Sequence, residues 1–169
     1  MNETSGVIVA GGRSVRMGEV EKTVVDVAGT PLIRRVADRL LAATDKLVVN
    51  CRPDQRAVIE DALDGLVPTF AIDDPPDRGP VAGIKTGLAA TTTEHAAVVA
   101  SDMPFLDPGL ITHLLERGDG HDAAVPRPGE WFEPLHAVYR SERVVSACER
   151  ALEAENPKIL EPLSRIDRA

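Results

Sequence analysis

The chain has 169 residues, and its 27 acidic against 19 basic side chains give a formal net charge of −8. This length favours a single domain with its own buried core. An acidic surface argues against nucleic acid and anionic membranes as partners, because both bind to basic surfaces. It does not exclude a small phosphorylated ligand, which needs only a local positive site.

The charge is unevenly distributed along the chain. Residues 1–56 carry nine Lys or Arg and seven Asp or Glu, whereas residues 57–169 carry ten and twenty. A phosphate site is therefore expected in the first third, unless the surface charge simply varies at random. Cys51 and Cys148 have no metal-ligand spacing, no signal peptide is evident, and no apolar run approaches the roughly 20 residues of a membrane span. We therefore expect a cytoplasmic protein.

Short apolar runs alternate with helical patterns along the chain. The runs are continuous and bounded by turn residues, which predicts buried parallel strands at Val7–Ala10, Leu47–Asn50, Val67–Ile72, Ala96–Ala100 and Ala123–Pro126. One-sided apolar spacing predicts helices at Pro31–Ala43, Gln55–Leu63, Ala82–Ala90, Asp107–Glu116 and Arg143–Glu155. Thr30 and Asp107 are expected to cap two of them. The alternation indicates an α/β fold with a mostly parallel sheet.

The stretch Trp131–Tyr139 interrupts this alternation. It reads as extended and contains Pro134. We expect it to form an added edge strand or antiparallel strand.

A glycine pair follows the first predicted strand, where ligands bind in open parallel sheets. Gly11 and Gly12 are followed by the cations Arg13, Arg16 and Lys22. Paired glycines let backbone N–H groups approach a phosphate closely, and the cations add positive charge. The spacing matches neither a P-loop nor the dinucleotide-binding fingerprint. The alternative is an ordinary glycine-rich turn.

Asp102 follows the predicted strand Ala96–Ala100. A carboxylate at the end of a buried strand is well placed to hold a Mg²⁺ ion that bridges nucleotide phosphates. Asp102 can equally cap a turn or the next helix.

The third predicted strand leads into an acidic loop that contains Asp73, Asp74 and Asp77 and ends at Gly79–Gly83. Its carboxylates would repel phosphate, so the loop is expected to meet a base, a ribose or a metal. Guanine offers N1–H and N2–H₂ donors that suit carboxylate or carbonyl acceptors. Asn50, at the end of the second strand, can bind a base or ribose or close its own turn. For the loop, the alternative is a solvated turn.

A second substrate could bind at the segment Glu133–Tyr139 and the preceding Arg127. Arg127 and His136 are the candidates, although a histidine in an apolar strand is more often structural. Cys51 has no paired histidine that would make it a nucleophile.

The order of these segments is more specific than any one of them. Over residues 6 to about 140 the chain resembles the molybdenum cofactor guanylyltransferase (MobA) family, whose nucleotidyltransferase domain is a Rossmann-like three-layer α/β sandwich. The resemblance rests on Val9-Ala10-Gly11-Gly12-Arg13-Ser14-x-Arg16-Met17-Gly18-x-x-x-Lys22, a strand-end Asn, Gly79-Pro80-x-Ala82-Gly83, Asp102-Met103-Pro104 and Pro134-Leu135-His136-Ala137-Val138-Tyr139.

The resemblance implies that molybdopterin carrying molybdenum reacts with GTP, with Mg²⁺ as cofactor, to give the guanine dinucleotide cofactor and pyrophosphate. It implies nucleotide contacts through the backbone of Val9, Ala10 and Gly11 and through Lys22, Asn50, Asp74 and Asp102, with Asp102 also the metal ligand. Gly12 and Arg13 complete the expected nucleotide site, in which Lys22, Arg16 and Asp102 are the expected catalytic residues. Asp73 leaves the register of Asp74 open by one residue. Molybdoenzyme maturation proteins are expected partners.

One departure from the family pattern keeps other functions open. Family members usually continue to an Asn-x-Asn-Thr-like element, whereas this chain ends at Ser164–Ala169. The alternatives are another nucleotidyltransferase, acting on adenosylcobinamide phosphate, 2-phospholactate or a sugar 1-phosphate, and a non-catalytic nucleotide-binding adaptor. In a single domain of residues 1–169, we expect residues 1 to about 105 to bind nucleotide and residues 106–169 to bind the second substrate.

Overall fold

The protein is described by a computed structural model, which covers residues 3–12, 22–154 and 157–169. In this part of the chain a six-stranded sheet has the order β3-β2-β1-β4-β6-β5. The strands are β1 (Ser5–Val9), β2 (Lys46–Cys51), β3 (Thr69–Ile72), β4 (His95–Ala100), β5 (Ala123–Ala124) and β6 (His136–Arg140). The first four strands of that order are parallel, and β6 is antiparallel to β4 and β5. The predicted single-domain α/β fold is thereby confirmed.

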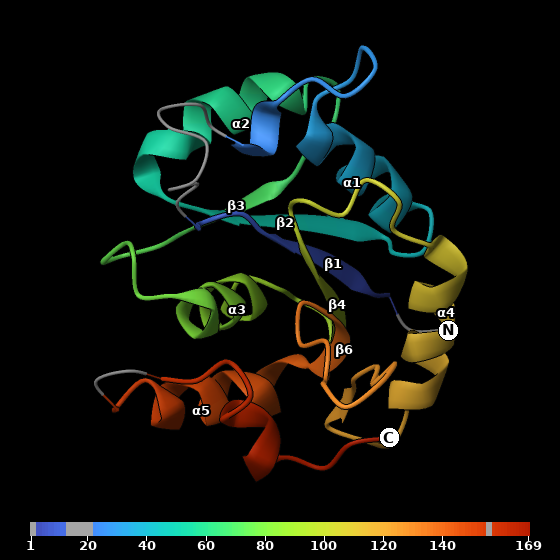
Figure 1. The fold of residues 1–169 in the computed structure, drawn as a ribbon, viewed down its shortest axis with the longest axis vertical. Coiled ribbons are helices and arrows are strands. Elements are labelled where there is room, and N and C mark those ends of the chain that lie inside the picture. Colours follow the sequence, from blue (N-terminus) through green and yellow to red (C-terminus); the bar gives the residue numbers. More distant parts are fainter. Residues whose placement is uncertain (1–2, 13–21, 155–156) are drawn as a thin grey trace.

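Helices cover both faces of the sheet and make three layers (Figure 1). They are α1 (Leu32–Leu41), α2 (Arg56–Ala62), α3 (Pro80–Ala89), α4 (Pro108–Gly118) and α5 (Ser141–Ala151), with short 3-10 turns η1 (Lys22–Val24), η2 (Pro53–Gln55) and η3 (Pro162–Arg165). Helices α1, α2 and α4 pack on one face, and α3 and α5 pack on the other. None of the helices in the described ranges is long and apolar enough to cross a bilayer.

The central strands are apolar at successive positions because both of their faces are buried. In β1, Val7 packs with the layer of α3 and α5, whereas Ile8 packs with the layer of α1 and α4. Both side chains are fully buried. The continuous apolar runs of the sequence follow from this two-sided burial.

Helix α3 can lie close against the sheet because two of its residues that face the sheet are glycine. A Cβ atom at Gly83 would lie 2.7 Å from Asn50 Oδ1 and 2.9 Å from Val9 Cγ1. A Cβ atom at Gly87 would lie 2.5 Å from Val7 Cγ1. Glycine lowers helix propensity, but tertiary packing overrides that cost and gives a regular helix at the predicted place.

The two predicted helix caps have opposite outcomes. The Asp107 carboxylate accepts a hydrogen bond of 2.8 Å from the Gly109 N–H, which confirms the cap of α4. The prediction for Thr30 was wrong, because Pro31 is the N-cap of α1 and no side chain caps it. The Leu32 N–H instead donates to the carbonyl of Val25 at 2.9 Å.

The strands β3 and β6 begin later than predicted. Val67 is 97% exposed and lies outside β3, and Pro68 beside it has no N–H to donate to a ladder. The stretch Trp131–Leu135 is likewise not part of β6, although the antiparallel pairing predicted for this region is confirmed. Since β6 lies between β4 and β5, it is an interior strand rather than an edge strand.

We predict that Leu40→Ala destabilises the fold. Leu40 is fully buried and fills the space above Gly6 in β1, where a Cβ would collide with it. Its truncation should lower the free energy of unfolding by about 2–5 kcal/mol, measured by urea denaturation. The control is Val67→Ala, which should change it by less than about 0.5 kcal/mol because Val67 is exposed. Equal losses for the two variants would contradict the assignment of the core.

Candidate active site

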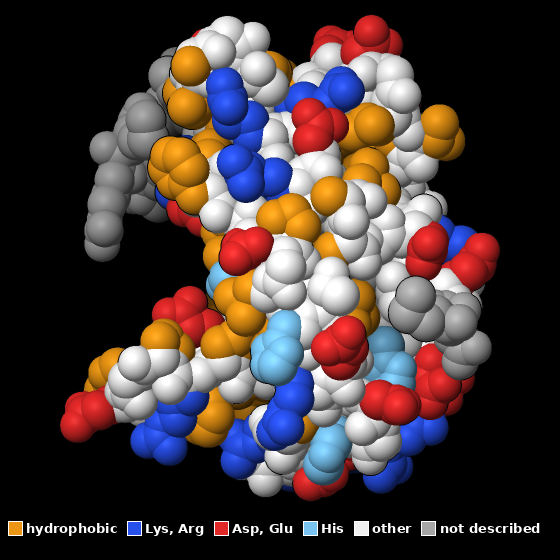
Figure 2. All heavy atoms as spheres, turned by 90° about the vertical axis from the view of Figure 1, so that its right-hand side faces the viewer, with side chains coloured by type: hydrophobic (Ala, Val, Ile, Leu, Met, Phe, Trp, Pro, Cys, Tyr) orange, Lys and Arg blue, Asp and Glu red, His pale blue; other side chains and the backbone are white. Residues whose placement is uncertain are grey.

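A large cleft opens beyond the carboxyl ends of the central strands. These strands end level with one another, since Val9 of β1 pairs with Asn50 of β2 and with Ala100 of β4. The cleft has a volume of about 1010 Å³. Figure 2, a view at right angles to Figure 1, shows a deep hollow at the left of the molecule. The cleft is lined by Val9, Ala10, Gly11, Gly12, Lys22, Thr23, Asn50, Asp73, Asp77, Arg78, Gly79, Pro80, Gly83, Ala100, Ser101, Asp102 and Leu135.

Lys22 and Asp102 form an ion pair in the cleft, although they are 80 residues apart in the sequence. Lys22 begins η1, and Asp102 lies two residues beyond β4. The strand end is held in place because the Ser101 N–H donates to the Val9 carbonyl at 3.3 Å. Both charged side chains are partly exposed, at 42% and 43%, so both can contact a ligand in the cleft.

Asn50 is fully buried at the floor of the cleft, and its amide has a fixed orientation. Its Nδ2 donates to the Ala71 carbonyl at 3.1 Å and to Asp73 Oδ1 at 2.7 Å. Both donor hydrogens are thereby used. Its Oδ1 lies beside Gly83 and has no hydrogen-bond partner among the described residues. The site therefore contains a buried acceptor that none of the described residues satisfies.

The structure places Asp73, rather than Asp74, in the cleft. The Asp73 N–H extends the β2–β3 pairing by donating to the Cys51 carbonyl at 3.0 Å, and only 7% of the residue is exposed. Asp74 is exposed and does not line the cleft. Burial raises the pKa of the Asp73 carboxyl, against the lowering effect of its hydrogen bonds with Asn50 and Thr86. The sequence did not show which of the two aspartates faces the cleft. The turn after β3 places Asp73 there and leaves Asp74 outside.

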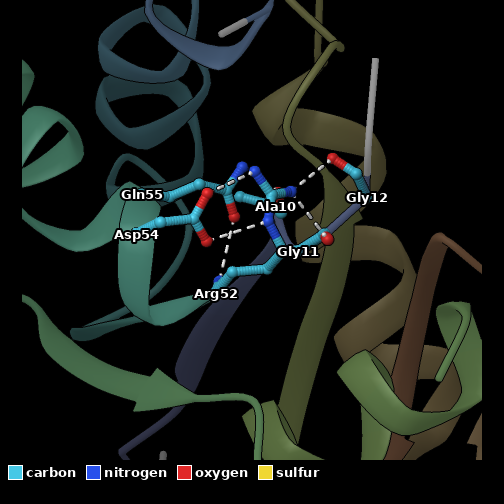
Figure 3. A network of polar contacts seen from close by, with 6 residues as sticks. All are labelled: Ala10, Gly11, Gly12, Arg52, Asp54 and Gln55. Atoms are coloured by element: carbon cyan, nitrogen blue, oxygen red, sulfur yellow. Dashed lines mark hydrogen bonds and ion pairs between the residues drawn. The ribbon is translucent and has the colours of Figure 1, made fainter. Parts of the chain in front are cut away.

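Arg52 binds the backbone of the glycine loop, Ala10–Gly12, and is not itself part of the cleft lining (Figure 3). Its Nη1 donates to the carbonyls of Gly11 at 3.1 Å and Gly12 at 3.0 Å. The same guanidinium binds both carboxylate oxygens of Asp54, through Nε at 3.1 Å and Nη2 at 3.2 Å. Arg52 is only 6% exposed, so this is a buried and well-paired charge.

Gln55 completes the same network. Its Nε2 donates to the Ala10 carbonyl at 2.9 Å, and its Oε1 accepts from the Arg52 N–H at 2.9 Å. Sequence reasoning gave Arg52 and Gln55 no role. The sequence feature that could have indicated a role was the presence of two long polar side chains directly after a buried strand, at the start of a helix.

Two of the predicted site residues, Arg13 and Arg16, lie outside the described residues. Two others, Arg127 and His136, do not join this cluster. Arg127 does not line the cleft and stacks over the Phe132 ring, 5.2 Å from its centroid. His136 does not line it either, and burial lowers the pKa of its imidazole.

The cysteines and carboxylates also limit the chemistry of the site. Burial raises the pKa of the Cys51 thiol to about 11, so it stays protonated near neutral pH and is a poor nucleophile.

Within the described residues no group of three or more His, Cys, Asp or Glu could form a metal site made of protein ligands alone. Mg²⁺ is typically bound by one or two carboxylates together with substrate phosphates. The single, partly exposed carboxylate of Asp102 fits that mode of binding.

The fold and the site define a class of enzyme, the nucleotidyltransferases. Residues 6–166 match the family model of the MobA-like NTP transferase domain. The chain therefore belongs to the MobA-like NTP transferase family, as its motifs predicted.

Individual relatives agree with this assignment. The chain is 65% identical to a protein of Natronomonas pharaonis named probable molybdenum cofactor guanylyltransferase, over 99% of this chain and 83% of that protein. A protein of Haloferax mediterranei with the same name is 38% identical over 96% and 77%. The crystal structure of molybdopterin-guanine dinucleotide biosynthesis protein A from Archaeoglobus fulgidus matches with a TM-score of 0.79 and 32% identity, over 98% and 81%.

We predict that Asp73→Asn stabilises the protein while weakening nucleotide binding. A raised pKa in the folded state means that wild-type stability falls as pH rises from 3.8, the unfolded value, through the folded pKa. The variant lacks this loss, so near pH 7 it should be more stable by up to about 1 kcal/mol. Thermal unfolding between pH 3 and 8 measures the first effect, and calorimetric titration with GTP and Mg²⁺ measures the second.

The matched control is the neighbouring Asp74→Asn. Because Asp74 is exposed and outside the cleft, this change should leave both properties unaltered. Weaker binding in the Asp74 variant alone would show that the register is reversed.

Proposed function

We propose that the chain transfers GMP from GTP to a molybdopterin-type molybdenum cofactor and releases pyrophosphate, with Mg²⁺ as its cofactor. The observation that carries this proposal is the pairing of Lys22 with Asp102 in the cleft at the strand ends. The names of the relatives supply the acceptor and the nucleotide.

The proposed reaction is an in-line displacement at phosphorus. An anionic oxygen of the acceptor's terminal phosphate forms a bond to the α-phosphorus of GTP, and the bond from that phosphorus to the bridging oxygen breaks. The electron pair leaves with pyrophosphate. Since the attacking phosphate is already an anion, the reaction requires no general base or protein nucleophile. Positioning and charge neutralisation then supply most of the lowering of the barrier.

The phosphates would be bound between the glycine loop and Lys22. The ammonium group of Lys22 exchanges the Asp102 carboxylate for phosphate oxygens, while the N–H groups of Gly11 and Gly12 add hydrogen bonds at close range. Asp102 is the residue that would hold Mg²⁺ beside those phosphates. When bound, the ion neutralises negative charge that develops on the phosphate oxygens.

The nucleoside end would be bound by hydrogen-bond acceptors. Asn50 and Asp73 both line the cleft and carry acceptor oxygens for N–H or O–H groups, of which Asn50 Oδ1 is buried. Guanine N1–H and N2–H₂ and the ribose hydroxyls are donors of this kind. This arrangement favours guanine over adenine, which has no N1–H.

Two wider aspects belong to the same proposal. The reaction is placed in the cytoplasm, where the buried and unpaired Cys51 and Cys148 stay reduced. Residues 106–169 are proposed to bind the acceptor, with Leu135 as their contribution to the cleft lining. Molybdoenzyme maturation proteins would receive the product, as the resemblance to the family implies.

We predict that Lys22→Ala and Asp102→Ala each lower kcat/KM by about 100-fold or more, because each removes a group that balances charge in the transition state. Pyrophosphate release from GTP and the molybdenum cofactor is the measurement. The control is Lys46→Ala, which breaks an ion pair with Glu3 of 2.7 Å that is not part of the cleft lining and should retain full activity.

A panel of nucleotides and acceptors separates the proposal from its alternatives. Release with GTP and the molybdenum cofactor, but not with ATP, supports it. Release only with adenosylcobinamide phosphate, 2-phospholactate or a sugar 1-phosphate identifies a different nucleotidyltransferase. Tight GTP binding without release from any acceptor identifies a nucleotide-binding adaptor. Near wild-type turnover in either alanine variant refutes the assigned site.

A further inference from the structure

Three consecutive backbone carbonyls of the glycine loop are held by buried side chains. Gln55 binds the carbonyl of Ala10, and Arg52 binds those of Gly11 and Gly12, at distances of 2.9 to 3.1 Å. Figure 3 shows both side chains reaching this loop from the segment that follows β2. Neither Arg52 nor Gln55 belongs to the cleft lining, whereas all three loop residues do.

These contacts fix the direction of the loop's N–H groups. In a trans peptide the carbonyl of one residue and the N–H of the next point in opposite directions. Holding the carbonyls of Ala10 and Gly11 therefore turns the N–H groups of Gly11 and Gly12 away from Arg52 and Gln55. Within the described residues neither N–H donates to a backbone or side-chain acceptor. Both are left available to a ligand.

The glycine pair makes such a restraint necessary. Without side chains, Gly11 and Gly12 permit close approach of a phosphate, but they also permit backbone conformations closed to other residues. A rotated peptide would present a carbonyl oxygen, rather than an N–H, to the phosphate. Asp54 neutralises the Arg52 guanidinium at 3.1 and 3.2 Å, so the effect of Arg52 lies mainly in its geometry rather than in its charge.

We propose that Arg52 and Gln55 are positioning residues that set the glycine loop for nucleoside triphosphate binding. This rests on the proposed function, since it requires the loop to bind the phosphates of GTP. An arginine suits the task because its planar fork reaches two carbonyls and a carboxylate at once, which the single ammonium of lysine does not. The pair acts only through the loop and touches no reacting atom.

The test compares two conservative variants, Arg52→Lys and Arg35→Lys. Arg35 also holds two consecutive loop carbonyls, with its Nε 2.8 Å from the Val27 oxygen and its Nη2 3.2 Å from that of Ala28. That second loop is not part of the cleft lining. The two substitutions therefore remove similar contacts, and they differ in whether the affected loop faces the cleft.

The dissociation constant for GTP with Mg²⁺ should rise roughly tenfold in Arg52→Lys, because misplaced binding groups lose much of their effect. It should change less than about twofold in Arg35→Lys. In steady-state kinetics, the KM for GTP should rise while the KM for the acceptor stays the same. A merely structural role would lower thermal stability in both variants without this split. Equal GTP affinity in Arg52→Lys and the wild type, or equal weakening in both variants, would overturn the proposal.

Two further measurements keep the test decisive. In protein labelled with ¹⁵N-glycine and free of nucleotide, the amide signals of Gly11 and Gly12 should shift in Arg52→Lys and not in Arg35→Lys. Unmoved signals would overturn the proposal even if the enzyme is active.

If Arg52→Lys does not fold, Gln55→Glu is used. It replaces the donor to the Ala10 carbonyl by an acceptor and should also weaken GTP binding. If the wild-type protein binds no GTP, the proposed function is wrong, and the positioning role that rests on it fails with it. If the wild type binds GTP and Arg52→Lys binds it equally well, only the positioning role is wrong.

Discussion

The burial of β1 on all sides is the constraint on which the rest of the structure depends. Parallel strands flank it on both edges, and helices cover both of its faces. The side chains of Val7, Ile8 and Val9 are therefore apolar, and the backbone groups of β1 are paired within the sheet. Polar chemistry can begin only where the strand ends. Because Val9, Asn50 and Ala100 lie level with one another, the segments that follow three separate strands meet at one place. The cleft follows from the register of the sheet.

The proposed function requires an acidic chain to bind a polyanion, and the charges of the cleft limit how it could do so. In the described part of its lining, the cations Lys22 and Arg78 are accompanied by the carboxylates of Asp73, Asp77 and Asp102. Side-chain charge alone therefore gives no positive surplus there. Backbone N–H groups carry partial positive charge without a counter-ion, and they attract an anion only when they are oriented toward it. Under the proposed function, the geometry of the glycine loop and a metal ion held by Asp102 would thus matter more for phosphate binding than net charge does.

The sequence allowed the fold class to be predicted, because two-sided burial leaves continuous apolar runs and one-sided burial leaves helical spacing. It also placed Asp102 at a strand end and Lys22 in the loop that follows the first strand, and the parallel sheet brings the ends of these strands together. The choice between Asp73 and Asp74 could not be made, because it depends on where the chain turns out of β3. The role of Arg52 was also out of reach, since its carbonyl partners are about 40 residues away and have no side chains that mark them.

The fixed amide of Asn50 leaves one hydrogen-bond acceptor at the floor of the cleft. Its Oδ1 lies in a side chain that is held by the carboxylate of Asp73, and both residues line the cleft. The same carboxylate also borders the glycine loop, because a Cβ atom at Gly11 would lie 2.3 Å from Asp73 Oδ2. Two unit charges 4 Å apart repel by about 4 kcal/mol at an effective dielectric constant near 20. Under the proposed function, a phosphate at the loop would therefore have to bind on the side of Gly11 that faces away from Asp73, which restricts the direction from which the triphosphate can approach.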